Sequence, residues 1–262
     1  MRIAVTGATG RVGHHVVDLL NADGHDVVSI ARSTGVDIVS GKGLAQALAG
    51  VETVIDAASG PSPDQEAATK FFTTAARNLQ ETGSQAGVQR LIVVSIIGID
   101  RFKAGYMAAK VAHEKVMLVG PIRVSILRAA QFHEFVEQIV DWGTQGDVSY
   151  VPRMRTQLVA ARTVAEELVN LAITPAAVRT SGSAPISEIA GPRTENLVDI
   201  AVKLIAKRGA PRRIESVSNT GDPDQALYES AGLLPGPKAK LAGPTFEEWL
   251  ASAAFSQGRS AA

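Results

Sequence analysis

The stretch Val5-Thr6-Gly7-Ala8-Thr9-Gly10-Arg11-Val12-Gly13 determines what the first half of the chain must form. The short apolar run Ile3-Ala4-Val5 leads into it and is typical of a buried strand. Apolar residues recur at helical spacing behind it, at positions 12, 16, 17, 19 and 20. The three glycines therefore lie on a predicted strand-to-helix turn.

Each glycine of this turn has a separate task in a dinucleotide-binding fold. Gly7 allows the tight turn, Gly10 lets the backbone approach a pyrophosphate, and Gly13 lets the helix pack close to the strand. The helix N-terminus offers free N–H groups and a partial positive charge of about half a unit to an anion. The alternative is a glycine-rich turn that binds nothing. The predicted site comprises Gly7, Thr9, Gly10, Arg11, Val12 and Gly13.

Composition limits the function. The 262 residues are 45% hydrophobic, enough for one large α/β unit or for a cofactor domain with a modest appendage. Lys plus Arg and Asp plus Glu both number 26, so the basic excess that nucleic-acid binding draws on is missing and direct binding is disfavoured. The chain has no cysteine, which excludes disulfides, thiol nucleophiles and cysteine metal sites. Redox chemistry must then come from a cofactor.

The sequence shows neither a membrane-spanning pattern nor a signal-peptide pattern. No run of about 18 apolar residues occurs, and the N-terminus opens on a strand without a signal-peptide pattern. We therefore expect a soluble, cytoplasmic protein that does not bind membranes. We further expect a monomer or homodimer that acts on a small-molecule substrate.

The end of the second predicted strand, residues 26–31, selects between cofactors. NAD-binding folds usually place an acidic residue there for the ribose 2′-hydroxyl, whereas this chain has Arg32-Ser33. Arg11 is a second cation within reach of a 2′-phosphate. We therefore expect NADP(H) to be preferred over NAD(H), with Arg32 and Ser33 in the site. The alternative is that Arg32 is a solvated surface charge.

Strand-like runs alternate with helical segments through residue 127. This order predicts a Rossmann-type, doubly wound parallel sheet of the α/β class. The small residues Ala57 and Ala58 end the fourth strand and leave room for a ligand. Ser62 is predicted to cap the next helix, whose broad apolar face covers the sheet or, alternatively, a partner subunit. The predicted strands are residues 2–6, 26–31, 36–39, 53–58, 90–95 and 121–127, with a brief helix near 44–48.

The second half of the chain is less regular. We expect residues 1–130 to form the NAD(P)-binding domain, with 156–175 packing back on it, and 131–262 to form a smaller substrate-binding lobe. Capping patterns predict helices that open at Thr163, Thr194, Asp222 and Thr245. Residues from Ser256 are a predicted frayed tail.

Tyr106 and Lys110 stand four residues apart, hence on one face of a predicted helix. This arrangement suits hydride transfer to a carbonyl, since the phenol exchanges the proton and the ammonium lowers the pKa of the phenol. Ser95, at the carboxyl end of the preceding strand, would hold the substrate oxygen. Lys110 would also hold the nicotinamide ribose. The structural alternative is an ordinary helix-face salt bridge between Lys110 and Glu114.

The histidines add little. His14 and His15 are adjacent and cannot share a metal by the usual helical spacing, so no metal site is predicted. His113 is placed on the Tyr106 helix but off the Tyr–Lys face. His133 lines the substrate cleft or, as the favoured alternative, is a structural histidine.

Thr-Gly-Ala-Thr-Gly at 6–10, with G-x-x-G-x-x-G spacing, resembles the short-chain dehydrogenase/reductase superfamily. Motifs throughout the chain resemble its atypical, NmrA-like NAD(P)-binding branch. The resemblance implies an NADP-favouring Rossmann domain. Some members reduce or isomerise small substrates, and others only sense the redox state of the nucleotide, so an oxidoreductase and a non-catalytic redox sensor of a protein partner both remain open. The motifs are residues 94–101, Tyr106-x-x-x-Lys110 with Glu114, 126–135, 159–166, 234–237 and 242–245.

Overall fold

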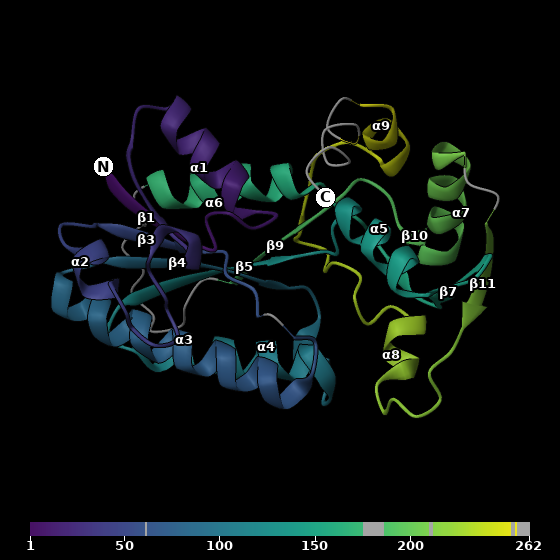
Figure 1. The fold of residues 1–262 in the computed structure, drawn as a ribbon, viewed down its shortest axis with the longest axis horizontal. Coiled ribbons are helices and arrows are strands. Elements are labelled where there is room, and N and C mark those ends of the chain that lie inside the picture. The colour runs from purple at the N-terminus through teal and green to yellow at the C-terminus, as the bar shows by residue number, and fades with distance from the viewer. Residues whose placement is uncertain (61, 175–185, 210–211, 253–254, 256–262) are drawn as a thin grey trace. The chain divides into compact units, whose positions relative to one another are not determined.

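The computed structural model describes residues 1–60, 62–174, 186–209, 212–252 and 255, and the chain divides into two compact units (Figure 1). The first unit comprises residues 1–95, 104–128 and 164–187, and the second comprises 96–103, 129–163 and 188–262. The assignment of residues 131–262 to substrate binding stays a prediction. Across the described residues, every helix falls short of the length and apolarity that crossing a bilayer requires.

The predicted Rossmann-type fold is confirmed. A seven-stranded sheet has the order β12-β9-β5-β4-β3-β1-β2, and β1 pairs in parallel with both β2 and β3. The strand order reverses between β1 and β3. Doubly wound sheets bind their ligands at such a reversal, in the crevice beyond the carboxyl ends of the strands. The strands are β1 Arg2–Thr6, β2 Asp26–Ile30, β3 Thr53–Asp56, β4 Arg90–Ile96, β5 Arg123–Ala129, β9 Ile186–Ala190 and β12 Lys240–Leu241.

Helices cover both faces of the strands of the first unit. Figure 1 shows α1 and α6 on one face and α2, α3 and α4 on the other. Because both faces are covered, residues 3–5 of β1 are completely buried, as expected of a parallel sheet. The apolar face of α3 packs in the same core as Val54 and Leu91, so it covers the sheet. These helices are α1 Gly13–Ala22, α2 Leu44–Leu48, α3 Gln65–Ala86, α4 Gly105–Val119 and α6 Ala161–Ile173.

Two predictions in the first unit are wrong. Residues 36–39 form a turn and no strand, because the Asp37 carboxylate accepts hydrogen bonds from Val39 N at 2.8 Å and Ser40 Oγ at 3.0 Å. The cap of α3 is Asp64 and not Ser62, since the Asp64 side chain accepts a hydrogen bond from Ala67 N at 2.9 Å. A short 3-10 turn, η1 Arg32–Thr34, follows β2.

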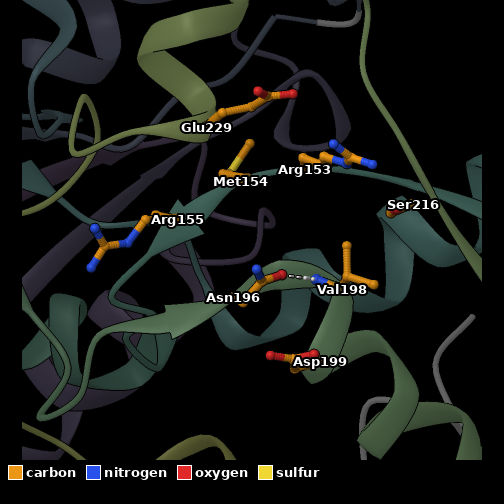
Figure 2. Close-up of a pocket in the computed structure, with 8 residues that line it drawn as sticks. All are labelled: Arg153, Met154, Arg155, Asn196, Val198, Asp199, Ser216 and Glu229. Atoms are coloured by element: carbon orange, nitrogen blue, oxygen red, sulfur yellow. Dashed lines mark hydrogen bonds between the residues drawn. The ribbon is translucent and has the colours of Figure 1, made fainter.

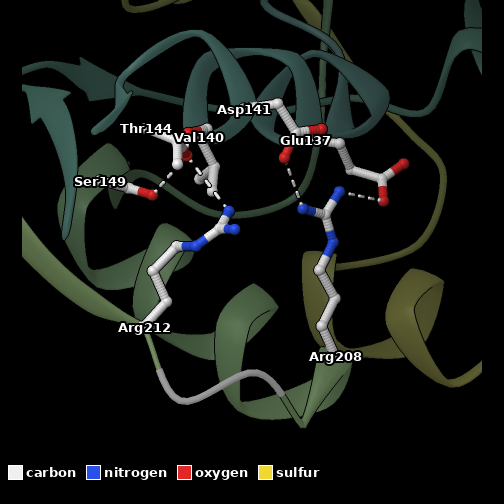
Figure 3. A network of polar contacts seen from close by, with 7 residues as sticks. All are labelled: Glu137, Val140, Asp141, Thr144, Ser149, Arg208 and Arg212. Carbon is white, nitrogen blue, oxygen red and sulfur yellow. Dashed lines mark hydrogen bonds and ion pairs between the residues drawn. The ribbon is translucent and has the colours of Figure 1, made fainter. Parts of the chain in front are cut away.

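The second unit holds two small sheets. β7 pairs with β6 and β11, and β8 pairs with β10. Arg208 joins its two longest helices, donating to Glu137 and Asp141 of α5 at 2.8 Å each (Figure 3). The elements are η2 Ile99–Arg101, α5 His133–Trp142, β6 Thr144–Gln145, β7 Val148–Pro152, β8 Arg155–Thr156, β10 Glu195–Asn196, α7 Leu197–Arg208, β11 Arg213–Val217, α8 Gln225–Glu229 and α9 Phe246–Ala251.

The predicted helix caps here have mixed outcomes. Thr245 caps α9 through a capping box with Glu248, as predicted. α6 instead begins two residues before Thr163, because the Glu134 carboxylate accepts the Ala161 N–H. The cap of α7 is Asn196, since the Thr194 hydroxyl donates to Gln157. The residue at the N-cap position of α8 is Asp224 and not the predicted Asp222, and its side chain makes no capping hydrogen bond. The tail predicted from residue 256 lies outside the described residues.

Candidate functional site

The glycine turn connects β1 to α1 as predicted, and two of its glycines are required by packing. Gly7 has φ of +64°, and a Cβ there would stand 2.6 Å from the Ala57 carbonyl oxygen. A Cβ on Gly13 would stand 2.0 Å from the Gly7 oxygen. Gly10 differs, because its Cβ would meet a single atom, the Gly7 oxygen at 3.1 Å. The space above Gly10 is therefore open for a ligand.

The start of α1 suits an anion. Thr9, Gly10 and Arg11 are exposed on the turn, whereas the Val12 side chain is buried and leaves only its backbone for a ligand. No side chain caps the helix, and its first turn carries no acidic residue. The positive end of its dipole is thus available to a phosphate. These features fit a dinucleotide pyrophosphate.

Arg32 and Ser33 lie in η1, directly after β2, and both are exposed. Asp37 is close by: its pKa is lowered, first by the hydrogen bond from Val39 N and in small part by the Arg32 charge. Both interpretations of Arg32, a 2′-phosphate contact and a solvated charge, are compatible with this position. Ala57 and Ala58 follow β3, and the Ala57 carbonyl lies against Gly7, so the structure brings these predicted site residues together.

Tyr106 and Lys110 lie one turn apart on α4, and both pack on Phe72 of α3. The Tyr106 ring meets Phe72 edge-on, with centroids 5.6 Å apart, and Lys110 Nζ lies 4.5 Å from the Phe72 centroid. Lys110 Nζ donates to Val94 O of β4 at 3.0 Å and to His113 Nδ1 at 3.0 Å. An ammonium has three donors, so one hydrogen is left for a ligand.

The predicted effect of Lys110 on Tyr106 is not found in this structure. Burial raises the pKa of the Tyr106 phenol to about 12, and no neighbouring charge offsets it. The reason is that the Lys110 ammonium points to Val94 and His113. Burial also lowers the pKa of Lys110 to about 8, against the opposing effect of the Asp56 and Glu114 carboxylates.

The predicted alternative, a salt bridge between Lys110 and Glu114, is wrong. Glu114 instead binds Arg128 of β5, whose Nη2 lies 2.8 Å and whose Nε lies 3.0 Å from the two carboxylate oxygens. A guanidinium fork matches a carboxylate better than an ammonium does, so Arg128 takes the acid.

Ser95 lies in β4, next to the carbonyl that accepts from Lys110. Its hydroxyl is buried and has no hydrogen-bond partner in the described part of the chain. A buried hydroxyl without a partner is unusual in a native protein and is available for a ligand oxygen. The substrate-binding role of Ser95 stays a prediction.

Asp56 and His113 are residues of this site that the sequence analysis missed. His113 was placed off the Tyr–Lys face, yet residues three apart on a helix are neighbours, and His113 contacts Lys110 directly. Asp56 Oδ2 lies 3.2 Å from His113 Nε2. An acidic residue at the end of an otherwise apolar buried strand was the signal that could have revealed the pair.

His133 is a structural residue and not a functional group of this site. His133 is completely buried. Its Nε2 atom lies 3.1 Å from the Pro244 carbonyl oxygen, and its ring packs beside Phe246 and Trp249. Burial lowers the pKa of His133 to about 4, so it is a neutral structural residue. The described residues contain no group of side chains suited to a metal ion.

The second unit has a cavity of its own, with a volume of about 330 Å³ (Figure 2). It is open to solvent and mixes both charges with apolar side chains. The lining residues are Arg153, Met154, Arg155, Asn196, Val198, Asp199, Ser216 and Glu229.

The sequence model of the NAD(P)H-binding family matches residues 7–175, which is more than half of the chain. The chain belongs to the NAD(P)H-binding family. The match starts at Gly7 and includes the turn, Ser95, Tyr106 and Lys110. No curated protein matches the sequence.

Solved structures share the fold over nearly the whole chain. MoeE5 in complex with UDP-glucose and NAD has 20% identity and a TM-score of 0.72, with all of both chains covered. A short-chain dehydrogenase/reductase superfamily protein from Agrobacterium tumefaciens with bound NAD has 17% identity and a TM-score of 0.69, with 99% of this chain and 98% of that one covered. TunA, an NAD-dependent NDP-hexosamine 5,6-dehydratase, has 17% identity and a TM-score of 0.69, with 98% of each covered. At these identities the similarity concerns the fold.

Proposed function

We propose that the protein is an NAD(P)H-dependent oxidoreductase that acts on a small carbonyl or quinone-like substrate. The observation that carries the proposal is the position of Lys110, a buried cation one helical turn from Tyr106 at the carboxyl end of β4. A nucleotide-binding domain alone does not need a buried cation beside a tyrosine, whereas proton exchange at a carbonyl does.

The residues divide the work by their chemistry. The nicotinamide, when bound, supplies or accepts the hydride. The Ser95 hydroxyl donates a hydrogen bond to the substrate oxygen, and Tyr106 gives that oxygen its proton. A phenol with a pKa of about 12 is protonated at neutral pH, which favours the reducing direction. The remaining N–H of Lys110 would hold the nicotinamide ribose when the nucleotide is bound.

We also propose that NADP(H) is preferred over NAD(H). The exposed cations Arg11 and Arg32 on the turn and after β2 support this preference, because a 2′-phosphate requires positive charge there. The structures of MoeE5 and of the Agrobacterium tumefaciens protein contain NAD, so a preference for NADP(H) would distinguish this chain from them.

Turnover tests the proposal directly. NADPH oxidation is followed at 340 nm with quinones, ketones and aldehydes. The proposal requires that at least one compound be reduced and that Tyr106→Phe abolish most of that turnover. Binding of NADPH without turnover of any compound would contradict it.

A redox sensor is the second candidate, and one observation favours it. Two of the three Lys110 donors are used inside the protein, and burial keeps the Tyr106 phenol far from ionisation. The NmrA-like branch that the motifs resemble contains such sensors. A sensor would show different affinities for a protein partner with oxidised and reduced nucleotide, and Tyr106→Phe would not change them.

We further propose a monomer or homodimer located in the cytoplasm, without membrane or direct nucleic-acid binding.

A further inference from the structure

A buried chain of polar contacts runs from β1 to α4 behind Lys110. We propose that Asp56 and His113 are positioning residues that hold the Lys110 ammonium beside β4 and maintain its charge. Their effect on Lys110 is a property of the protein alone, and only its consequence for turnover rests on the proposed function.

The fold aligns the four members of this chain. Thr6 and Asp56 are register partners on adjacent strands, and the Thr6 hydroxyl donates to Asp56 Oδ1. Asp56 Oδ2 lies 3.2 Å from His113 Nε2, and His113 Nδ1 lies 3.0 Å from Lys110 Nζ. Thr6, Asp56, His113 and Lys110 are 0%, 3%, 1% and 4% exposed, so water does not screen these contacts.

The hydrogen-bond donors and acceptors of Lys110, His113 and Asp56 are compatible with one arrangement of protons and charges. An ammonium only donates, so His113 Nδ1 must accept from Lys110. The single proton of the neutral imidazole is then on Nε2 and faces the Asp56 carboxylate. The chain therefore joins a cation to an anion through a neutral ring of fixed tautomer, and it is neutral as a whole.

The titration behaviour of the two residues agrees with this arrangement. Burial, helped by the Lys110 charge, lowers the pKa of His113 and keeps the ring neutral. Burial alone would raise the pKa of Asp56, but the close contact with the His113 imidazole, the Thr6 hydroxyl and the Lys110 charge hold it below its usual value. Asp56 is thus ionised at neutral pH.

Lys110 depends chiefly on Asp56, whose charge has the larger of the two carboxylate effects on the Lys110 pKa. A buried ammonium is stable only with a compensating charge and hydrogen bonds. Glu114 also raises the pKa of Lys110, but its carboxylate oxygens are bound by Arg128. The charged and titratable groups around Lys110 are Asp56 from β3, Tyr106, His113 and Glu114 from α4, and Arg128 from β5.

The first test measures the titration of Lys110 in the protein without nucleotide. NMR of ¹³Cε-labelled lysine follows the signal, which Lys110→Arg assigns by its loss. The wild-type midpoint is expected near pH 8. Asp56→Asn removes the compensating charge and should move the midpoint below about pH 7. An unchanged midpoint overturns the proposal.

The second test separates the hydrogen bond from packing. His113→Leu fills the same space against Phe72 but cannot accept from Lys110, whereas the Gln side chain of His113→Gln can. The proposal requires a lowered Lys110 midpoint in His113→Leu and a midpoint near the wild-type value in His113→Gln. Equal midpoints in both variants contradict it. The matched control is His133→Leu, which removes another completely buried histidine and should leave Lys110 unchanged.

The NMR midpoints and the turnover measurements test the role of Asp56 and His113 separately from the proposed oxidoreductase function. If wild-type protein reduces no substrate, the oxidoreductase proposal fails while the NMR midpoints still decide the role of Asp56 and His113. If it does reduce one, the alkaline limb of kcat/KM should shift to lower pH in His113→Leu and return in His113→Gln. Circular dichroism verifies folding, and Thr6→Val replaces Asp56→Asn if that variant does not fold, with a smaller shift in the same direction.

Discussion

Glu114 on α4 and Arg128 on β5 form a bidentate pair, with both partners largely buried and contact distances of 2.8 and 3.0 Å. This pair fastens the helix that carries Tyr106 and Lys110 to the sheet that they face. It also neutralises the carboxylate nearest to Lys110 in sequence.

Breaking the pair should destabilise the fold. Arg128→Met leaves the Glu114 carboxylate buried without a partner, and we expect a loss of about 3 kcal/mol in the free energy of unfolding by urea. The double variant Glu114→Gln with Arg128→Met should lose less than the single one, since no charge remains buried. A single-variant loss below about 1 kcal/mol would mean that the pair contributes little.

The glycines of the turn should separate stability from binding. Gly7→Ala and Gly13→Ala bring a Cβ within 2.6 and 2.0 Å of backbone oxygens, so both should unfold at clearly lower temperature than the wild type. Gly10→Ala meets only the Gly7 oxygen, at 3.1 Å, and should lose much less stability, but its methyl group occupies the space of the pyrophosphate. We expect NADPH affinity to fall at least about tenfold. A Gly10→Ala variant with unchanged affinity would place the nucleotide elsewhere.

His133 should make the protein less stable in acid. Its pKa in the folded state, about 4, lies below the unfolded value of about 6.5, so the unfolded chain takes up the proton first. The stability that its neutral form permits is fully present above about pH 6.5 and is lost as the pH falls towards 4. His133→Leu should flatten this part of the stability profile, measured by urea unfolding between pH 4 and 7. An equally steep profile in the variant would assign the effect to other groups, such as His113.

Tyr106 and Lys110 should differ in what their removal affects. Tyr106→Phe should keep nucleotide affinity and lower turnover by a factor of about 10² to 10⁴, the usual effect of a lost general acid. Lys110→Ala should weaken both, because it removes the ammonium that we propose holds the nicotinamide ribose and so positions the nicotinamide for hydride transfer. Steady-state kinetics and calorimetry distinguish the two. Unchanged turnover of a verified substrate by Tyr106→Phe would reduce the pair to helix packing on Phe72.

The sequence predicts the Rossmann-type fold because its signals are local. The glycine turn depends on contacts between residues 7 and 13, and the buried strands appear as uninterrupted apolar runs. Residues 36–39 show the limit of this reasoning. They have a strand-like composition, but the Asp37 side chain bonds its own backbone neighbours and a turn forms instead.

The part of the site that the sequence did not predict depends on contacts between residues far apart in the chain. Asp56 and His113 are 57 positions apart and meet only because β3 and α4 pack together, which no periodicity in the sequence reveals. The direction in which Lys110 points is likewise set by partners from β4 and its own helix. This is why its predicted effect on the Tyr106 pKa is wrong.

Calorimetric titration of NADPH and of NADH tests the central claim, that the turn of residues 7–13 binds a nicotinamide dinucleotide. We predict one nucleotide per chain, tighter binding of NADPH than of NADH, and a loss of that difference in the double variant Arg11→Ala with Arg32→Ala. Equal affinities in the wild type would remove the NADP preference, and the absence of binding to either nucleotide would contradict the account as a whole.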